Sequence, residues 1–273
     1  MSLRDYFLLN QKKLEAQYPG LTLRRLSEEF ELYKTLKKDE AQFFKLINEG
    51  IPLAYITEMA PFYKNDFIVN PHVLIPRFET EILVEMAVKE LHELHKNHIT
   101  PTVIDVGTGS GCIILSLMTE CPFPLRAFGI DLSFEALKIA NQNKERLEEK
   151  INSQSELKLI AGDRLHDFSV KAHLIVSNPP YIKRREDRSK VHSQVLRFEP
   201  ELALFIDDIS YDDWFSTFFK QVYLTLEEGG IFIMEGHEDH LVSLLPLASE
   251  AGLVAPSVHK DYTGRNRFLT AKK

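Results

Sequence analysis

The sequence contains few cysteines, no long apolar run and no excess of positive charge. Only two of its 273 residues are cysteines, Cys112 and Cys121, and their spacing matches no zinc site. We expect both to be buried, reduced thiols, and we expect no metal site. No apolar run approaches the roughly 20 residues that a membrane-spanning helix needs, and the first residues lack the apolar core of a signal or transit peptide. These absences predict a cytoplasmic protein with no membrane partner.

Acidic residues outnumber basic residues in this chain. It has 40 Asp and Glu against 33 Lys and Arg, a net charge of −7 and a pI of about 5.8, so no global positive field attracts nucleic acid. Residues 1–72 hold ten basic and ten acidic side chains, and this neutrality is unlike a DNA-reading module. We expect a monomer that does not take nucleic acid as its partner.

The first 76 residues differ in pattern from the rest. Apolar residues recur at three- and four-residue spacing over 1–50, which predicts helices, two of them opening on the capping residues Thr22 and Asp39. Residues 51–75 then show two runs of aromatic and β-branched residues on either side of Asn65-Asp66. This pattern predicts a β-hairpin that links a small helical unit to a larger domain.

Strand and helix patterns alternate over most of the remaining chain. We expect strands at 102–106, 126–131, 157–163, 173–178 and 230–236, and helices at 111–120, 133–150, 211–227 and 238–251. Near-continuously apolar strands that alternate with helices predict a parallel α/β sheet covered on both faces. The strand at 173–178 should lie beside the strand at 102–106, where ligands bind in such sheets. The tail predicts an antiparallel hairpin on the sheet edge, turning at Gly264.

A glycine-rich loop, DVGTGSG (105–111), follows the first of these strands. Glycines there let the backbone turn tightly and approach a ligand. Acidic residues end the next two strands, at Asp131 and Asp163; the first can accept ribose hydroxyls and the second can reach an adenine amino group. Acids at three strand ends suit a ligand with a sulfonium or an amine better than a pyrophosphate. The candidate cofactor-binding residues in the loop are Gly107, Thr108, Gly109, Ser110 and Gly111.

The segment SNPPY (177–181) ends the strand at 173–178 with an amide, two prolines and a phenol. Proline lacks an N–H and fixes φ at about −65°, so the segment is stiff and offers carbonyl oxygens with few competing donors. An NH₂ group can give one hydrogen to the Asn178 side chain and the other to the Pro179 carbonyl, while Tyr181 offers a flat face to a planar group. We therefore predict direct in-line attack of a planar NH₂ on an activated methyl. We expect no histidine in the neighbourhood of this motif to act as a general base.

Together with VLIPRFETE (73–81), the loop and the SNPPY segment resemble the bacterial and organellar peptide chain release factor N5-glutamine methyltransferases. PLAYIT (52–57), LRFEPELAL (196–204) and KDYTGRNR (260–267) are also similar, so the resemblance runs from about residue 50 to the end. It implies a seven-stranded, Rossmann-like, class I S-adenosylmethionine-dependent methyltransferase with a small N-terminal helical domain joined by a β-hairpin. The implied reaction methylates N5 of the glutamine in the Gly-Gly-Gln motif of class I release factors, which supports translation termination.

The resemblance also implies the domains and the site. Residues 1–50 would form a substrate-docking domain, 51–76 a β-hairpin linker, and 77–273 the methyltransferase domain. Besides the glycine loop, the residues expected to hold S-adenosyl-L-methionine are Asp131 at the ribose, Asp163 and Arg164 at the adenine, and Asn178. Those expected to clasp the glutamine amide are Asn178, Pro179, Pro180 and Tyr181, with Asn178, Pro179 and Tyr181 as the catalytic set.

Four positions depart from the family pattern. Phe78 replaces a proline, Glu58 a glycine and Arg164 an aromatic residue, and 235–237 reads Glu-Gly-His where the family has Glu-His-Gly. The Arg164 guanidinium can either stack on the adenine or face solvent. Because Arg77 and Glu79 are retained around Phe78, we expect activity to be retained.

Other functions share parts of this pattern. Adenine N6 and guanine N2 are also planar NH₂ groups, so the SNPPY segment alone does not separate a nucleic-acid methyltransferase from a glutamine methyltransferase; the acidic chain and the LIPRFETE block favour glutamine. A binding module without catalysis would bind the cofactor but would not need Asn178. A dehydrogenase is excluded because Cys112 stands where the dinucleotide motif needs a glycine. The charged segment 182–200 suits either a mobile basic lid or a solvated loop.

Overall fold

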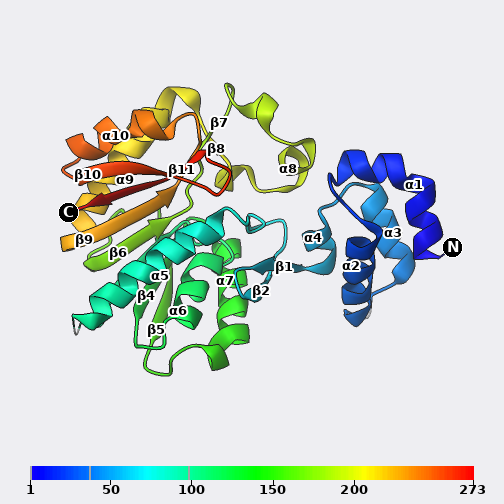
Figure 1. Ribbon diagram of the computed structural model, residues 1–273, viewed down its shortest axis with the longest axis horizontal. Coiled ribbons are helices and arrows are strands. Elements are labelled where there is room, and N and C mark those ends of the chain that lie inside the picture. Colours follow the sequence, from blue (N-terminus) through cyan, green and yellow to red (C-terminus); the bar gives the residue numbers. More distant parts are fainter. Residues whose placement is uncertain (1, 37, 98) are drawn as a thin grey trace.

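The computed structural model describes residues 2–36, 38–97 and 99–273. A small helical body lies beside a larger α/β body (Figure 1). Thr22 and Asp39 cap their helices as predicted, because their side chains accept hydrogen bonds from the backbone N–H groups of Arg25 and Ala41. The helices of the small body are α1 (Leu3–Gln17), α2 (Leu23–Thr35), α3 (Glu40–Asn48) and α4 (Leu53–Thr57). They enclose an apolar core of their own that contains Tyr33 and Phe43.

The predicted hairpin is shorter than expected. Helix α4 occupies its first part, because Leu53 and Ile56 pack into the core of the small body. The strands are β1 (Met59–Phe62) and β2 (Asn65–Ile68), which pair antiparallel. The turn lies at 63–64 and not at Asn65-Asp66, since Asn65 already pairs with Phe62 in the ladder. Helix α4 ends at Glu58 with a φ of 58°, a backbone conformation that favours the glycine expected there.

The larger body is built on a seven-stranded sheet, as predicted. Its strand order is β10-β11-β9-β6-β3-β4-β5, and the five strands from β9 to β5 are parallel. Strand β6 lies beside β3 as expected, and the tail forms the antiparallel edge hairpin β10-β11. The bounds are β3 (Thr102–Val106), β4 (Arg126–Asp131), β5 (Glu156–Ala161), β6 (Ala172–Ser177), β9 (Leu226–Glu235), β10 (Val254–Lys260) and β11 (Asn266–Lys272).

Helices cover both faces of the sheet (Figure 1). On one face lie α5 (Thr80–Lys96), α6 (Cys112–Glu120) and α7 (Phe134–Leu147), and on the other α9 (Tyr211–Thr225) and α10 (Leu241–Glu250). Neighbouring residues of β3 alternate between the two cores: Val103 packs with the first group and Ile104 with the second. Every residue of β3 is buried, as its apolar pattern predicts.

The chain between β6 and α9 is folded and not an open loop. It contains the short parallel pair β7 (Ile182–Lys183) and β8 (Phe205–Ile206), and the helix α8 (Ser193–Phe198). The side chains of Gln194 and Arg197 donate hydrogen bonds to the carbonyl oxygens of Gly50 and Glu49. Segment 182–200 therefore connects the α/β body to the helical body.

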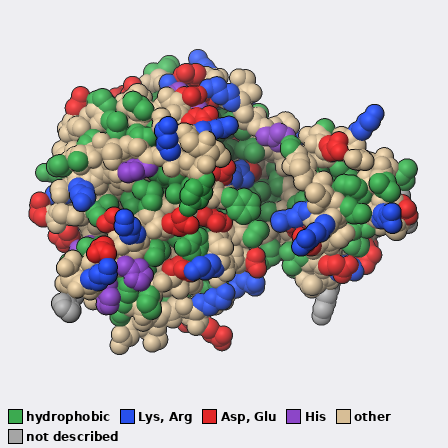
Figure 2. Space-filling model, viewed as in Figure 1, with side chains coloured by type: hydrophobic (Ala, Val, Ile, Leu, Met, Phe, Trp, Pro, Cys, Tyr) green, Lys and Arg blue, Asp and Glu red, His purple; other side chains and the backbone are tan. Residues whose placement is uncertain are grey.

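Charges of both signs are mixed on the visible face of the helical body (Figure 2). Arg24 pairs with Glu28, and Arg25 with Glu29, in helix α2 of this body. This agrees with the neutral balance counted in the sequence. Within the described ranges, every helix is too short or too polar to cross a membrane.

Candidate active site

The carboxyl ends of the central parallel strands open on a cavity of about 270 Å³, which we call the first cavity. The glycine loop after β3 and the SNPPY segment after β6 both line it. The backbone carbonyl of Asn178 lies so close to the loop that a Cβ added to Gly107 would be 3.9 Å from it. Predicted site residues that line this cavity are Gly107, Thr108, Gly109, Ser110, Asp131, Asp163, Arg164, Asn178, Pro179 and Pro180. Gly111 and Tyr181 do not line it.

The glycine loop adopts a backbone that side chains disfavour. Gly107, Gly109 and Gly111 have φ values of 75°, 56° and 80°, in the left-handed region that glycine enters without strain. At Gly111 a Cβ would also lie 3.1 Å from a methyl of Leu115. Gly111 therefore shapes the turn into α6 without contacting the first cavity.

Asp131 is held in place by two backbone donors. Its carboxylate oxygens accept hydrogen bonds of 2.8 Å from the N–H groups of Gly109 and Ser133. Burial raises the pKa of Asp131 above its usual range, against these hydrogen bonds, which lower it. A carboxylate has about four lone-pair sites, so lone pairs remain for hydroxyl groups of a ligand.

Asp105 lies beneath the glycine loop and is completely buried. One of its oxygens accepts a hydrogen bond of 2.7 Å from the Thr108 hydroxyl, and the other has no hydrogen-bond partner among residues 2–36, 38–97 and 99–273. Burial is the largest effect and raises the pKa of this carboxyl to about 7. The residue supports the loop at a cost in electrostatic free energy.

Arg164 lies over an aromatic ring and does not extend into solvent. Its guanidinium is 4.9 Å from the centre of the Trp214 ring and hydrogen-bonds the carboxylate of Asp163. The hydrogen bond from Arg164 lowers the pKa of Asp163. Trp214 also lines the first cavity. It therefore supplies an aromatic ring beside Arg164, the position at which the family has an aromatic residue. Sequence reasoning missed Trp214, which lies 50 residues away in α9.

Asn178 lines a second cavity as well, of about 300 Å³. Tyr181, His237 and Arg267 line this second cavity but not the first. The Tyr181 hydroxyl donates a hydrogen bond of 2.9 Å to Glu235, and burial raises the pKa of the tyrosine well above its usual value. Asn178 is therefore the one residue of the SNPPY segment that faces both cavities.

The known relatives of this chain are methyltransferases. The family described as "Methyltransferase small domain" matches residues 80–204. A release factor glutamine methyltransferase from Koribacter versatilis is 41% identical over 68% of this chain, and the match spans 62% of that protein's length. A protein of the same name from Leptospira interrogans is 34% identical over 80% of this chain and 73% of its own length.

The chain belongs to the release factor glutamine methyltransferase family.

Among solved structures, the chain is similar to a ribosomal protein L11 methylase from Lactobacillus delbrueckii subsp. bulgaricus. The TM-score is 0.51 at 19% identity, over 77% of this chain and 88% of the other. At this low identity the likeness concerns the fold alone. It agrees with the predicted class I methyltransferase architecture.

Two segments that carry the family resemblance meet in space. Arg77, from the LIPRFETE block, donates a hydrogen bond of 2.6 Å to Glu199 of LRFEP. The other oxygen of Glu199 accepts a hydrogen bond from the backbone N–H of Ile75. Phe78, the neighbour of Arg77, is 71% exposed, so its replacement of the family's proline leaves this pair intact.

The Glu-Gly-His order at 235–237 places a glycine where the packing is close. A Cβ on Gly236 would lie 2.6 Å from a methyl of Leu241, so a side chain at this position would require Leu241 to shift. The histidine stands at 237, where the ring centre is 6.4 Å from that of Tyr181. The expectation that no histidine lies near the motif is thus wrong in space, because 56 residues separate the two in the chain.

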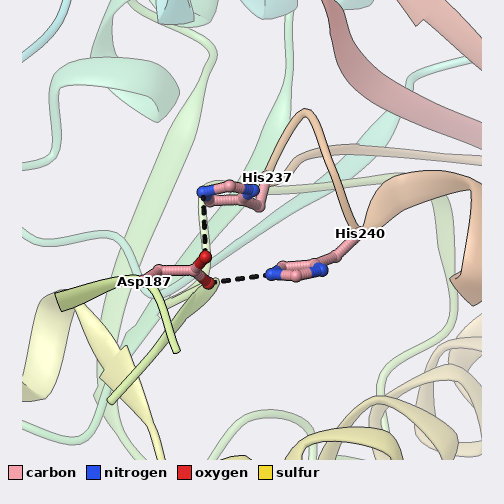
Figure 3. A group of neighbouring side chains, drawn as sticks. All are labelled: Asp187, His237 and His240. Carbon is pink, nitrogen blue, oxygen red and sulfur yellow. Dashed lines mark hydrogen bonds and ion pairs between the residues drawn. The ribbon is translucent and has the colours of Figure 1, made fainter. Parts of the chain in front are cut away.

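His237 belongs to a cluster with Asp187 and His240 (Figure 3), which we call the Asp187 latch. Asp187 accepts hydrogen bonds from His240 at 2.8 Å, from the Lys183 backbone N–H at 3.1 Å and from Lys190 at 3.2 Å. Burial raises the pKa of Asp187, but the hydrogen bond from His240 and its other donors outweigh burial and hold the pKa below its usual range. The latch ties the segment after the SNPPY motif to the start of α10.

The hydrogen bonds of the latch do not favour a metal. Nδ1 of His237 accepts a hydrogen bond from the backbone N–H of Asp239, which places the proton of a neutral imidazole on Nε2, the atom that faces Asp187. Burial also lowers the pKa of His237, so the neutral form dominates at neutral pH. The Lys190 ammonium beside Asp187 opposes a cation further.

Proposed function

We propose that this chain transfers a methyl group from S-adenosyl-L-methionine to the side-chain amide nitrogen, N5, of the glutamine in the Gly-Gly-Gln motif of class I peptide chain release factors. Membership of the release factor glutamine methyltransferase family supports the reaction and the substrate. The single observation that carries the proposal is that Asn178 lines two adjacent cavities. A methyl donor in the first cavity and an acceptor amide in the second would meet at this side chain.

The residues around the first cavity fit the proposed cofactor. The glycine loop leaves room for a ligand close to the backbone, Asp131 offers lone pairs to ribose hydroxyls, and Trp214 with Arg164 provides a flat surface for the adenine. When bound, S-adenosylmethionine supplies a methyl group activated by a sulfonium. The nearby acids Asp131 and Asp163 suit a cationic ligand better than they suit a pyrophosphate.

The chemistry of the acceptor follows from the amide. Its nitrogen is a weak nucleophile, because its lone pair is delocalised into the carbonyl, so position and hydrogen bonding must raise the rate. The Asn178 side-chain oxygen and the Pro179 carbonyl accept its two hydrogens, and both become better acceptors as positive charge grows on nitrogen. Correct orientation of two reactants is worth about 7 to 11 kcal/mol relative to free encounter.

His237 does not serve as the base in this proposal. Its Nδ1 is occupied by the backbone N–H of Asp239, and its Nε2 carries the proton of the neutral ring. No lone pair of this imidazole then points at the acceptor. The proton leaves the methylated nitrogen after transfer, when it is far more acidic than the starting amide.

We further propose the division of labour between the parts of the chain. Residues 1–50 dock the release factor, 51–76 link the two bodies, and 77–273 bind the cofactor and carry out the transfer. We infer that the enzyme acts as a monomer in the cytoplasm, where release factors meet ribosomes. The apolar core of the helical body supports its treatment as a unit.

A methyl-transfer assay tests this function. The full chain is incubated with radiolabelled S-adenosylmethionine and, in separate reactions, with a class I release factor, tRNA, rRNA or DNA. We expect label in the release factor, and none in a factor whose Gly-Gly-Gln glutamine is replaced by alanine. Label in nucleic acid alone would instead support N6-adenine or N2-guanine methylation.

A further inference from the structure

Asn178 and three neighbouring side chains form one continuous series of hydrogen bonds. The Asn178 Nδ2 group donates to the Thr80 hydroxyl at 3.2 Å, and that hydroxyl donates to Glu235 Oε2 at 2.6 Å. Tyr181 donates to the other oxygen, Oε1, at 2.9 Å. The four residues come from the start of α5, the segment after β6 and the end of β9, so the series joins elements that are far apart in sequence.

The direction of these bonds follows from the ionised form of Glu235. In that form its carboxylate accepts and does not donate, so the Thr80 hydroxyl gives its only hydrogen to Glu235. Its oxygen can then only accept from Asn178, and the NH₂ end of the Asn178 amide must face Thr80. The oxygen end of the amide is left free of this series.

We propose that Thr80 and Glu235 are positioning residues for methyl transfer, which hold the Asn178 amide with its oxygen toward the acceptor nitrogen. This inference rests on the proposed function. The two ends of an asparagine amide have nearly the same shape, so packing alone does not choose between them. A flipped Asn178 would present an NH₂ group to the acceptor NH₂, and two donors facing each other cannot form the required hydrogen bond.

The Glu235 carboxylate and its partner Thr80 are both buried, which costs free energy. Glu235 is 1% exposed and Thr80 is 2% exposed, and burial raises the pKa of Glu235. A buried carboxylate is costly unless hydrogen bonds offset its desolvation. Glu235 lies at the carboxyl end of β9, beside β6, and its carboxylate accepts the hydrogen bond of Tyr181. The hydroxyl partners of Glu235 are Thr80 and Tyr181. If Glu235 only supported the fold, there would be no need for Thr80 also to contact Asn178.

The alternative is that Thr80 and Glu235 only hold α5 and β9 together. Both readings predict some loss of stability when either residue is changed. They differ in whether the loss of turnover depends on Asn178. A double-mutant cycle measures this dependence, because coupled residues show non-additive effects.

The experiment compares kcat on an intact class I release factor for Thr80→Val, Thr80→Ser and Glu235→Gln. Thr80→Val keeps the shape but loses the hydroxyl, and Glu235→Gln supplies an NH₂ that can reverse the direction of the series. We expect each to lower kcat by about tenfold or more, with the Kd for S-adenosylmethionine within about twofold of wild type. Thr80→Ser, which keeps the hydroxyl, should stay within about threefold of wild-type kcat.

The matched control is Thr57→Val. Thr57 is also buried and also donates to a buried carboxylate, that of Glu29, but in the helical body. It should lower stability by an amount similar to that for Thr80→Val and leave kcat near wild type. In an Asn178→Ala background, Thr80→Val should lower kcat by less than about twofold further, because the amide that it orients is gone.

Three results would overturn the inference. Equal effects of Thr80→Val with and without Asn178, or wild-type kcat in both Thr80→Val and Glu235→Gln, would show that these residues do not orient the amide, with the methyl transfer itself intact. If the wild-type enzyme transfers no methyl group to the glutamine, the proposed function fails and the positioning role fails with it.

Discussion

At the scale of single residues, Asn178 is the point on which the proposed reaction depends. It lines both cavities, and in the proposed reaction its oxygen is the acceptor whose hydrogen bond strengthens as the transition state forms. We expect Asn178→Ala to lower kcat by at least about a hundredfold, the usual effect of losing one transition-state hydrogen bond. Steady-state kinetics with the release factor, and calorimetric titration of S-adenosylmethionine, check this. Turnover near wild type with normal cofactor binding would rule out the role.

Asp105 gives a pH-dependent prediction at the same scale. Burial raises its pKa from 3.8 to about 7, so between about pH 4 and 7 the folded protein holds a proton that the unfolded chain has released. The stability that this group contributes therefore falls as pH rises through that window, by at most about 1.4 kcal/mol per pH unit. Asp105→Asn removes the titration and can still accept the Thr108 hydroxyl.

Urea unfolding of both proteins at several pH values measures this effect. The difference in unfolding free energy should move in favour of Asp105→Asn as pH rises from 4 to 7. A constant difference over this range would show that Asp105 does not carry a raised pKa in the folded state.

Sequence reasoning identified the residues whose role follows from local pattern. The glycine loop, Asp131 and the SNPPY segment each stand at the end of a recognisable strand, and the sheet brings them to one edge. Thr80 lies within the VLIPRFETE block that carries the resemblance, but its hydrogen bonds to Asn178 and Glu235 cannot be read from the sequence. Trp214 lies on a helix, where nothing in the local pattern distinguishes a site residue from a core residue. Glu235 carried a signal that was available: it is a fourth acid at the end of a parallel strand.

At the scale of elements, the parallel strands were predictable because each is a short apolar run between helices. The hairpin at 51–75 was predicted less well. Its first run forms helix α4, because Leu53 and Ile56 gain more from the apolar core of the helical body than from a strand pairing. Tertiary packing decided the conformation of this short segment, and local propensity did not.

The Asp187 latch supports a prediction about the segment after the SNPPY motif. Asp187→Ala removes the acceptor of His240, of Lys190 and of the Lys183 N–H, so residues 183–190 should open more often. Trypsin should then cut at the basic residues of this segment several times faster than in wild type, because local opening exposes the backbone.

The control for this experiment is Glu186→Ala. Glu186 lies in the same segment and is exposed. Among the described residues, its carboxylate accepts a hydrogen bond only from the Lys183 ammonium. Exposed ion pairs of this kind contribute little to stability. Its tryptic rate should match wild type. Equal rates for Asp187→Ala and wild type would contradict the role of the latch.

At the scale of the whole molecule, the helical body is proposed to dock the release factor. Leu8 and Leu9 of α1 are 57% and 76% exposed, and neighbouring exposed apolar side chains are typical of contact surfaces. The double variant Leu8→Ser, Leu9→Ser should raise KM for the intact factor by about fivefold or more, with kcat unchanged. Leu224→Ser, at an exposed leucine of α9, is the control and should leave both constants unchanged. An unchanged KM in the double variant would argue against docking through this face.

In the proposed reaction, the acceptor is the glutamine amide nitrogen of the Gly-Gly-Gln motif. Tandem mass spectrometry of a class I release factor, after incubation with the enzyme and S-adenosylmethionine, tests it most directly. We expect one added methyl group, located on the side chain of that glutamine and absent when Asn178→Ala enzyme is used. An unmodified factor in a reaction where tRNA, rRNA or DNA gains the methyl group would contradict it.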